Sequence, residues 1–252
     1  MAHQQCVLKQ IGVVGLLKSK LGCLDIPGFS FTAIHCILHQ EAFCSKSIQL
    51  KEIMDVVVKT VNCMRARGLN HRQFTSFLTS MDSDYRELLY HTEVRWLSRG
   101  NVLKCFFALR EKIDSFMKMK NKEVPQLADF IYISNLAFLT DLTDLLNVLN
   151  TKLQGRKQLI TQMFDNVKAF QIKLTLWKKQ LSVRNLVHFS NLNCLETVEP
   201  TSLKEYPDII SNLQMQFNRR FQDVRVLEPH FKLYSIPFAV EMDNVANELQ
   251  ME

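Results

Sequence analysis

Glycine and proline are scarce in this chain, with seven and six of them among 252 residues. Both residues interrupt regular structure, so their scarcity argues against a disordered chain or a fold built from short strands and turns. Long hydrophobic runs are also absent, because no apolar stretch approaches the roughly 18 residues that a membrane-spanning helix needs. We therefore expect a folded, mostly helical protein that does not cross a membrane.

Paired cysteines are missing too. The seven cysteines are odd in number and scattered, which is typical of reduced thiols in a nuclear or cytoplasmic protein and not of a disulfide framework. Cys36 and His39 form a Cys-x-x-His pair, but a zinc site needs two more ligands and no second pair stands at ligand spacing downstream. We predict a structural role for both residues, with Cys36 buried and His39 hydrogen-bonded, and expect no metal or other cofactor.

Positive charge is concentrated in two stretches of the sequence. Residues 95–122 hold eight basic residues against two acids, and residues 168–184 hold five basic residues and no acid. Such clustering is the electrostatic footprint of a phosphate-binding face, although a solvated helix surface gives the same pattern.

Helical spacing dominates the chain after residue 48. Apolar stripes predict helices over residues 50–64, 71–81, 98–123, 138–155, 160–181 and 202–225. The stripe from Ile160 to Leu181 includes Trp177 and alternates steps of three and four, which predicts a seam within an intramolecular bundle or a coiled coil. Ser98 is a candidate N-cap of the third helix.

Strand character is confined to the N-terminal part. The segment SFTAIHCILHQEAF, residues 30–43, mixes β-branched and aromatic residues and follows a turn signal at Pro27-Gly28. We therefore predict a small β element ahead of the helices.

Three sequence blocks carry a family resemblance. HCILHQ (residues 35–40), RARGLNHRQF (residues 65–74) and HTEVRWLSRG (residues 91–100) resemble, in this order, the transposase-derived proteins of the hAT superfamily. The resemblance implies an incomplete RNase H-like α/β core over residues 1–48 and a helical insertion-type domain over residues 49–252. An incomplete core sheet would leave an unpaired edge near Ile34, Ile37 and Phe43, which a protein partner would have to cover.

The resemblance also bears on catalysis. Transposases of this family hold two divalent metals with an Asp, Asp, Glu set, and the metals stabilise the attacking and leaving oxygens. The segment MAHQQCVLKQI, where the second Asp is expected, holds no acid, and the first Asp and the Glu would lie beyond the ends of this chain. Asp25 and Glu196 stand in the wrong contexts. We therefore predict that the protein is not an enzyme.

The same resemblance places Trp96, in its Arg-Trp-x-Ser context, near nucleic acid. An indole can stack on an unpaired base while neighbouring cations meet phosphates, and Trp96 can equally pack as an anchor of the bundle. The first hypothesis is a nuclear protein with residual, non-sequence-specific DNA binding through Arg95, Trp96, Arg99 and Lys104. The alternatives are a helical protein-interaction module, nuclear or cytoplasmic, and a truncated gene copy without a selected role.

Overall fold

Helices account for all the regular structure in the described part of the chain. The computed structural model describes residues 13–22, 33–48, 51–65, 68–81, 96–155, 157–196 and 200–235, and within these ranges no strand occurs. The prediction of a mostly α-helical protein is therefore confirmed. The predicted RNase H-like α/β core finds no support in the described residues.

The chain divides into two compact units. The larger unit comprises residues 37–221, and the other combines residues 1–36 with residues 222–252. The larger unit contains α3 (Ile37–Lys46), α4 (Lys51–Arg65), α5 (Gly68–Ser80), α6 (Trp96–Met119), the 3₁₀ helix η1 (Pro125–Ala128), α7 (Phe130–Leu153), α8 (Ile160–Ser182), α9 (Ser190–Asn193) and α10 (Pro200–Arg220). This division into units reflects which residues contact one another in space. The predicted domain boundary at residue 48 stays a prediction.

The other unit contains α2 (Val13–Gly22), α11 (Gln222–Arg225) and α12 (Glu228–Ser235). Its described contacts include a 3.4 Å approach of His35 Nδ1 to Asp223 Oδ2. Val224 of α11 is buried, while Val13 and Leu16 of α2 expose 74% and 58% of their surface. None of the described helices of either unit is long and apolar enough to cross a membrane.

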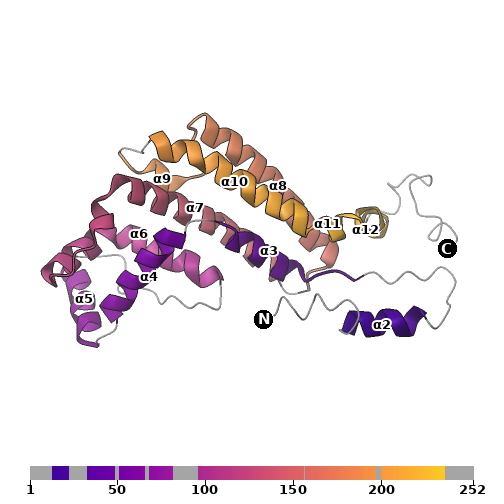
Figure 1. Cartoon of the computed structure of the whole chain (residues 1–252), viewed down its shortest axis with the longest axis horizontal. Coiled ribbons are helices and arrows are strands. Elements are labelled where there is room, and N and C mark those ends of the chain that lie inside the picture. The colour runs from indigo at the N-terminus through magenta and orange to yellow at the C-terminus, as the bar shows by residue number, and fades with distance from the viewer. Residues whose placement is uncertain are drawn as a thin grey trace. The chain divides into compact units, whose positions relative to one another are not determined.

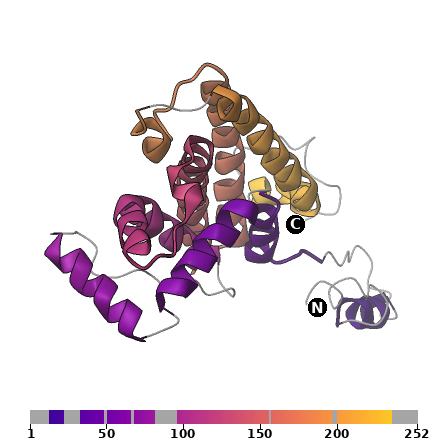
Figure 2. The same cartoon turned by 60° about the vertical axis from the view of Figure 1, so that its left-hand side comes forward.

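Helix α7 occupies the centre of the larger unit. It packs against α3, α4 and α6 on one side and against α8 and α10 on the other, as Figures 1 and 2 show. Its N-terminus is capped by Asp129, whose carboxylate accepts a 2.9 Å hydrogen bond from the Ile131 N–H, as an N-cap residue should. A helix surrounded in this way must bury several of its faces, and every residue of α7 from Leu136 to Thr143 is buried.

The pair formed by α8 and α10 closes the upper side of the unit in Figure 1. Aromatic rings hold it together: Phe170 meets Trp177 edge-on at 5.5 Å and Phe217 at 5.3 Å between ring centroids. Trp177 is 3% exposed, which confirms its predicted place in the core. The predicted seam thus packs within the chain, except that Ile160 remains 39% exposed.

The predicted strand over residues 30–43 is wrong where the structure describes it. Residues from Ile37 onward form α3, which runs to Lys46. Its buried positions are Ile37, Glu41, Cys44 and Ser45, separated by steps of four, three and one, which is the spacing of one helical face. Because two of these buried residues are polar, the sequence hides the apolar stripe that would have identified a helix.

The predicted exposed sheet edge is wrong for the same reason. Ile37 is only 3% exposed, and Ile34 and Phe43 are half-buried. The Arg220 guanidinium lies 4.9 Å from the centroid of the Phe43 ring and covers part of it. A protein partner is therefore not needed to cover an edge at this place.

The downstream helices agree with the predicted stripes, with shifted ends. The stripe predicted over residues 50–64 forms α4 from Lys51 onward, with Leu50 outside the described residues, and the next stripe forms α5. Helix α6 already begins at Trp96, so Ser98 lies inside the helix and is not its N-cap. The predicted last helix is interrupted after Arg220, and residues 222–225 form the separate α11.

Candidate binding surfaces

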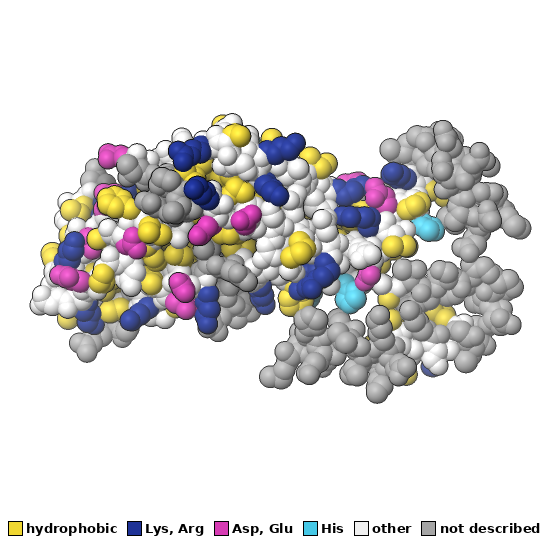
Figure 3. All heavy atoms as spheres, turned by 45° about the horizontal axis from the view of Figure 1, so that its top comes forward, with side chains coloured by type: hydrophobic (Ala, Val, Ile, Leu, Met, Phe, Trp, Pro, Cys, Tyr) yellow, Lys and Arg dark blue, Asp and Glu magenta, His cyan; other side chains and the backbone are white. Residues whose placement is uncertain are grey.

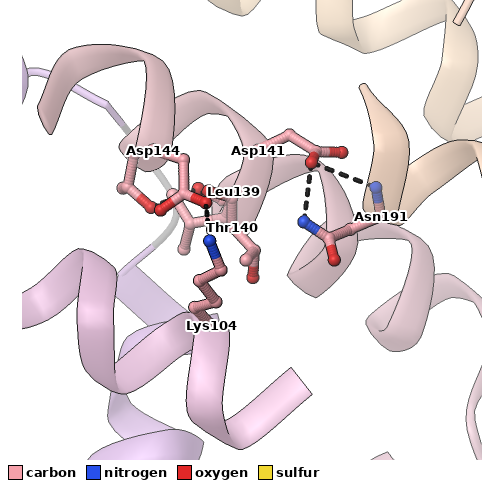
Figure 4. Close-up of polar contacts among 7 residues, drawn as sticks. Lys104, Leu139, Thr140, Asp141, Asp144 and Asn191 are labelled. Atoms are coloured by element: carbon pink, nitrogen blue, oxygen red, sulfur yellow. Dashed lines mark hydrogen bonds and ion pairs between the residues drawn. The ribbon is translucent and has the colours of Figure 1, made fainter. Parts of the chain in front are cut away.

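The predicted nucleic-acid-binding residues gather at the start of α6. Arg95 lies outside the described residues, and for Trp96 and Arg99 the structure describes the helical backbone only. Lys104 is 57% exposed, and its Nζ lies 3.3 Å from Asp144 Oδ2 on α7. Figure 4 shows this ion pair between the two helices.

Other cations of α6 also have acidic partners. Lys118 Nζ lies 2.7 Å from Asp114 Oδ2, one turn away, and Arg110 Nη2 lies 3.0 Å from Glu111 Oε1. Both acids belong to residues 95–122 and are already part of the charge count, so the net charge of this stretch is unchanged, but two of its cations already have an anionic partner. On the face that Figure 3 shows, lysines and arginines are interspersed with acidic and hydrophobic side chains.

The Cys-x-x-His pair does not lie where it was expected. Cys36 precedes α3 and His39 lies on it, and both are exposed, so the predicted burial of Cys36 is wrong. Within the described ranges, no group of three or more His, Cys, Asp or Glu side chains has the geometry to hold a metal ion.

A polar network connects α7 to α9. The Asp141 carboxylate is 4% exposed and accepts hydrogen bonds from the backbone N–H groups of Asn191 and Leu192 at 3.1 and 3.0 Å, and from the Asn191 amide at 2.7 Å (Figure 4). It thus caps the N-terminus of the four-residue α9 from a neighbouring helix. Burial raises the pKa of Asp141, against the lowering effect of these hydrogen bonds.

A second polar network connects α7 to α3. Glu41 is fully buried and accepts hydrogen bonds from the Ser45 hydroxyl at 2.8 Å and the Asn150 amide at 2.6 Å. Burial raises the pKa of Glu41, although both hydrogen bonds lower it. These two networks fix how helices pack on α7. Their side chains are buried among helices, which favours a structural role over contact with a ligand.

A shallow groove runs between α7 and α8. Its walls come from residues one helical turn apart on each helix, and it is lined by Leu145, Val148, Leu149 and Lys152 of α7 and by Asn166, Ala169, Phe170, Lys173 and Trp177 of α8. Its cavity volume is about 60 Å³. This is well below the roughly 300–1,000 Å³ of small-molecule pockets, so the groove suits individual side chains of a partner and not a whole ligand.

Exposed apolar side chains line this groove or adjoin its lining residues in the sequence. Val148 on its α7 wall is 55% exposed. Ile172 and Leu176, which directly precede the lining residues Lys173 and Trp177 on α8, are 71% and 46% exposed. Their neighbours Lys152 and Lys173 are exposed and form no ion pair within the described part of the chain. We call Leu145, Val148, Leu149, Lys152, Asn166, Ala169, Phe170, Ile172, Lys173, Leu176 and Trp177 the α7–α8 surface. Exposed apolar surface rimmed by polar groups is typical of a docking site.

The described fold therefore defines a helical domain with a candidate docking groove on its surface. Comparison with known proteins gives its family: the model of the FAM200/GTF2IRD2 helical domain matches residues 35–182. The chain belongs to this FAM200/GTF2IRD2-like family. It is 43% identical over 241 residues to general transcription factor II-I repeat domain-containing protein 2 of Bos taurus, and 44% identical over 225 residues to the protein of the same name of Mus musculus.

These matches cover most of this chain but little of the relatives. They span 96% and 89% of the chain, and 25% and 24% of the cattle and mouse proteins. The chain therefore spans about a quarter of the length of the curated relatives it matches. No solved structure matches it significantly. The matches show the FAM200/GTF2IRD2-like family, and the predicted hAT origin stays a prediction.

Proposed function

We propose that the chain is a non-catalytic protein-binding domain of a nuclear protein derived from an hAT-type transposase. The α7–α8 surface carries this proposal, because apolar side chains and two lysines that have no ion-pair partner among the described residues lie at a groove between adjacent, well-packed helices. Rigid helices can present such a groove to a partner without reorganising.

The nuclear and non-catalytic parts have separate support. The relatives are named as proteins with transcription factor II-I repeats, and transcription takes place in the nucleus. The hAT ancestry rests on the three sequence blocks, and the lack of catalysis rests on the segment MAHQQCVLKQI, which holds no acid where the resemblance places the second Asp. Nuclear location is checked by fractionating cells that express the tagged chain, and a purely cytoplasmic pool would contradict it.

The experiment that tests protein binding compares the proteins that are labelled near this chain and near its variants in living cells. The chain fused to a proximity-labelling enzyme is compared with an Ile172→Glu/Leu176→Glu variant, and nuclease treatment before capture removes neighbours held through nucleic acid. We expect the variant to lose a defined set of nuclease-resistant neighbours. A matched Val187→Glu/Met215→Glu variant changes two apolar residues exposed by 67% and 58% outside this surface and should retain that set. Identical neighbours for all three proteins would refute the proposal.

Nucleic-acid binding remains a second candidate function. Lys173, Lys178, Lys179 and Arg184 are exposed and have no ion-pair partner among the described residues, and Trp96 and Arg99 lie on the first turn of α6. The test is binding of the purified chain to hairpin-ended and single-stranded DNA across a salt series, with Trp96→Ala alongside. Affinity that falls steeply with salt and weakens in the variant would favour this candidate. Absence of binding at low salt would eliminate it.

A further inference from the structure

The α7–α8 surface has a definite length and direction. Its α8 wall extends from Asn166 to Trp177, eleven positions apart, which at 1.5 Å per residue corresponds to about 16 Å. This is the length of about three turns of α-helix. Helix-in-groove recognition uses apolar anchors at i, i+3, i+4 and i+7, which span about 10 Å and therefore fit within this length.

The charges on this surface are of one sign. Lys152 lines the α7 wall and Lys173 the α8 wall, and no acidic residue lines the groove. The nearest acid along α8, Asp165, already pairs with Lys168 at 2.9 Å. Both groove lysines therefore lack an anionic partner in the described chain, beside the apolar floor formed by Leu149, Phe170 and Trp177.

The two lysines are also placed apart along the groove. Because α7 and α8 are consecutive helices joined by a short connection and run antiparallel (Figures 1 and 2), Lys152 at the end of α7 faces the beginning of α8 near Asn166. Lys173 lies seven positions beyond Asn166, which corresponds to about 10 Å along the helix. An occupant would therefore meet one cation near the Asn166 end of the groove and a second, on the opposite wall, about two thirds of the way along it.

We propose that the α7–α8 surface docks an amphipathic, acidic α-helix of a protein partner. The inference rests on the proposed protein-binding function and specifies its partner class. The apolar stripe of the partner helix packs on the groove floor and against Val148, Ile172 and Leu176. Carboxylates on its two flanks, about seven residues apart, meet Lys152 and Lys173.

Two other occupants fit the surface less well. A nucleic acid backbone needs a track of cations, whereas this groove offers two lysines on either side of an apolar floor. A basic helix would bring like charges against both lysines, and like charges at an interface are unfavourable. The surface complements apolar and acidic groups at the same time, which an acidic amphipathic helix supplies.

The test uses the purified full chain and a fluorescein-labelled peptide of 18 residues, of about five helical turns. The peptide carries leucines at i, i+3, i+4 and i+7 and glutamates on both flanks. The comparison peptide has the same composition in an order that breaks the stripe. Fluorescence anisotropy should give saturable binding of the first peptide and at least tenfold weaker binding of the second.

Charge reversal then locates the site. The Lys152→Glu/Lys173→Glu variant should bind the acidic peptide about tenfold more weakly and should gain affinity for a peptide in which lysines replace the glutamates. The matched variant Lys51→Glu/Lys204→Glu reverses two exposed lysines at the starts of α4 and α10, where acids suit the helix dipole, and should behave as the wild type. Unchanged thermal unfolding of both variants shows that folding is intact.

Several outcomes would overturn the inference. Equal binding of the two peptides, no binding of the acidic peptide, or charge reversal without effect would each refute it. Displacement of the peptide by single-stranded DNA at low molar excess would identify the surface as a polyanion site instead. If the Ile172→Glu/Leu176→Glu variant loses its cellular neighbours while the acidic peptide fails to bind, the protein-binding function stands and only the partner class is wrong.

Discussion

At the scale of single residues, the most unusual group is the buried carboxyl of Glu41. It is fully buried on α3, and its hydrogen bonds within the described part of the chain come from Ser45 and Asn150. Two neutral donors compensate a buried carboxylate only in part, so burial dominates and the pKa is raised from its ordinary value of 4.5.

This raised pKa predicts a particular dependence of stability on pH. Below pH 4.5 the Glu41 carboxyl is protonated in both the folded and the unfolded chain. As the pH rises above that value, the unfolded chain releases the proton while the folded chain retains it, so the folded state becomes less favoured. Glu41→Gln removes this loss, and its free energy of unfolding should rise relative to wild type by up to about 1.4 kcal/mol per pH unit within the window.

Urea unfolding of both proteins between pH 4.5 and pH 8 measures this difference. Glu205→Gln, at an exposed position on α10, serves as the control. Its free energy of unfolding should change with pH in parallel with that of the wild type. Parallel profiles for Glu41→Gln as well would show that the carboxyl does not hold its proton in the folded protein.

The described cysteines should differ sharply in reactivity. Burial raises the pKa of Cys44 to about 12, so its thiol stays protonated at neutral pH, and Cys105 is buried as well. Cys36 and Cys194 are exposed. Because the thiolate is the reactive species and must be reached by the reagent, iodoacetamide at pH 7.5 should modify Cys36 and Cys194 at least about tenfold faster.

Peptide mass spectrometry after timed alkylation gives the rates. In urea above the unfolding midpoint, all four thiols should react at similar rates, which separates protection by folding from any effect of local sequence. Rapid labelling of Cys44 in the folded protein would contradict the packing of α3 against α7 and α10.

At the scale of helices, Asp141 should contribute far more to stability than Asp144, although both lie on α7. The Asp141 carboxylate accepts hydrogen bonds from two backbone N–H groups of α9. Asp141→Ala leaves both N–H groups without this acceptor. Leaving buried donors unsatisfied costs about 1–3 kcal/mol each, so for two donors we expect a loss of about 2–6 kcal/mol in the free energy of unfolding.

Asp144→Ala is the matched control on the same helix. It removes only the ion pair with Lys104, whose side chain is 57% exposed, and such pairs are worth about 0–1 kcal/mol. Chemical denaturation of both variants gives the comparison. Equal losses would mean that α9 finds other partners and that the Asp141 network does not hold it.

The same scale shows how far the sequence could predict this protein. The stripe of α4 places Ile53, Val57 and Val61 on one face, and all three are buried, so periodicity alone located that helix. Helix α3 was mistaken for a strand because its buried face includes Glu41 and Ser45, which read as surface residues. Polar residues in the core can be recognised only when their partners on other helices are known.

The candidate site could be predicted only in part for a related reason. The sequence identified Lys173 as one of a run of basic residues and Trp177 as core. It could not show that Val148 stays exposed beside Lys173, since that depends on how α7 packs on α8. Lys104, selected for its place in a basic stretch, instead has an acidic partner from another helix.

At the scale of the whole molecule, the division into two compact units predicts how much chain the bundle needs. The unit of residues 37–221 contains α3 through α10 together with the aromatic contacts of Phe138, Phe170 and Phe217. A chain of this length is well within the size at which a single domain folds cooperatively. A shortened chain of residues 37–221 should therefore fold alone and unfold in one transition.

The measurement is calorimetric unfolding of the shortened and the full chain. We expect the midpoint temperature of the main transition to differ by no more than about 4 °C between the two chains. For a domain of this size, such a shift corresponds to a change of about 1–2 kcal/mol in the free energy of unfolding. Loss of cooperative unfolding would show that residues 1–36 or 222–252 belong to the core of the bundle.

Every residue of the α7–α8 surface lies within residues 37–221. The shortened chain should therefore bind the acidic helix as the full chain does, which would place partner binding in the bundle itself.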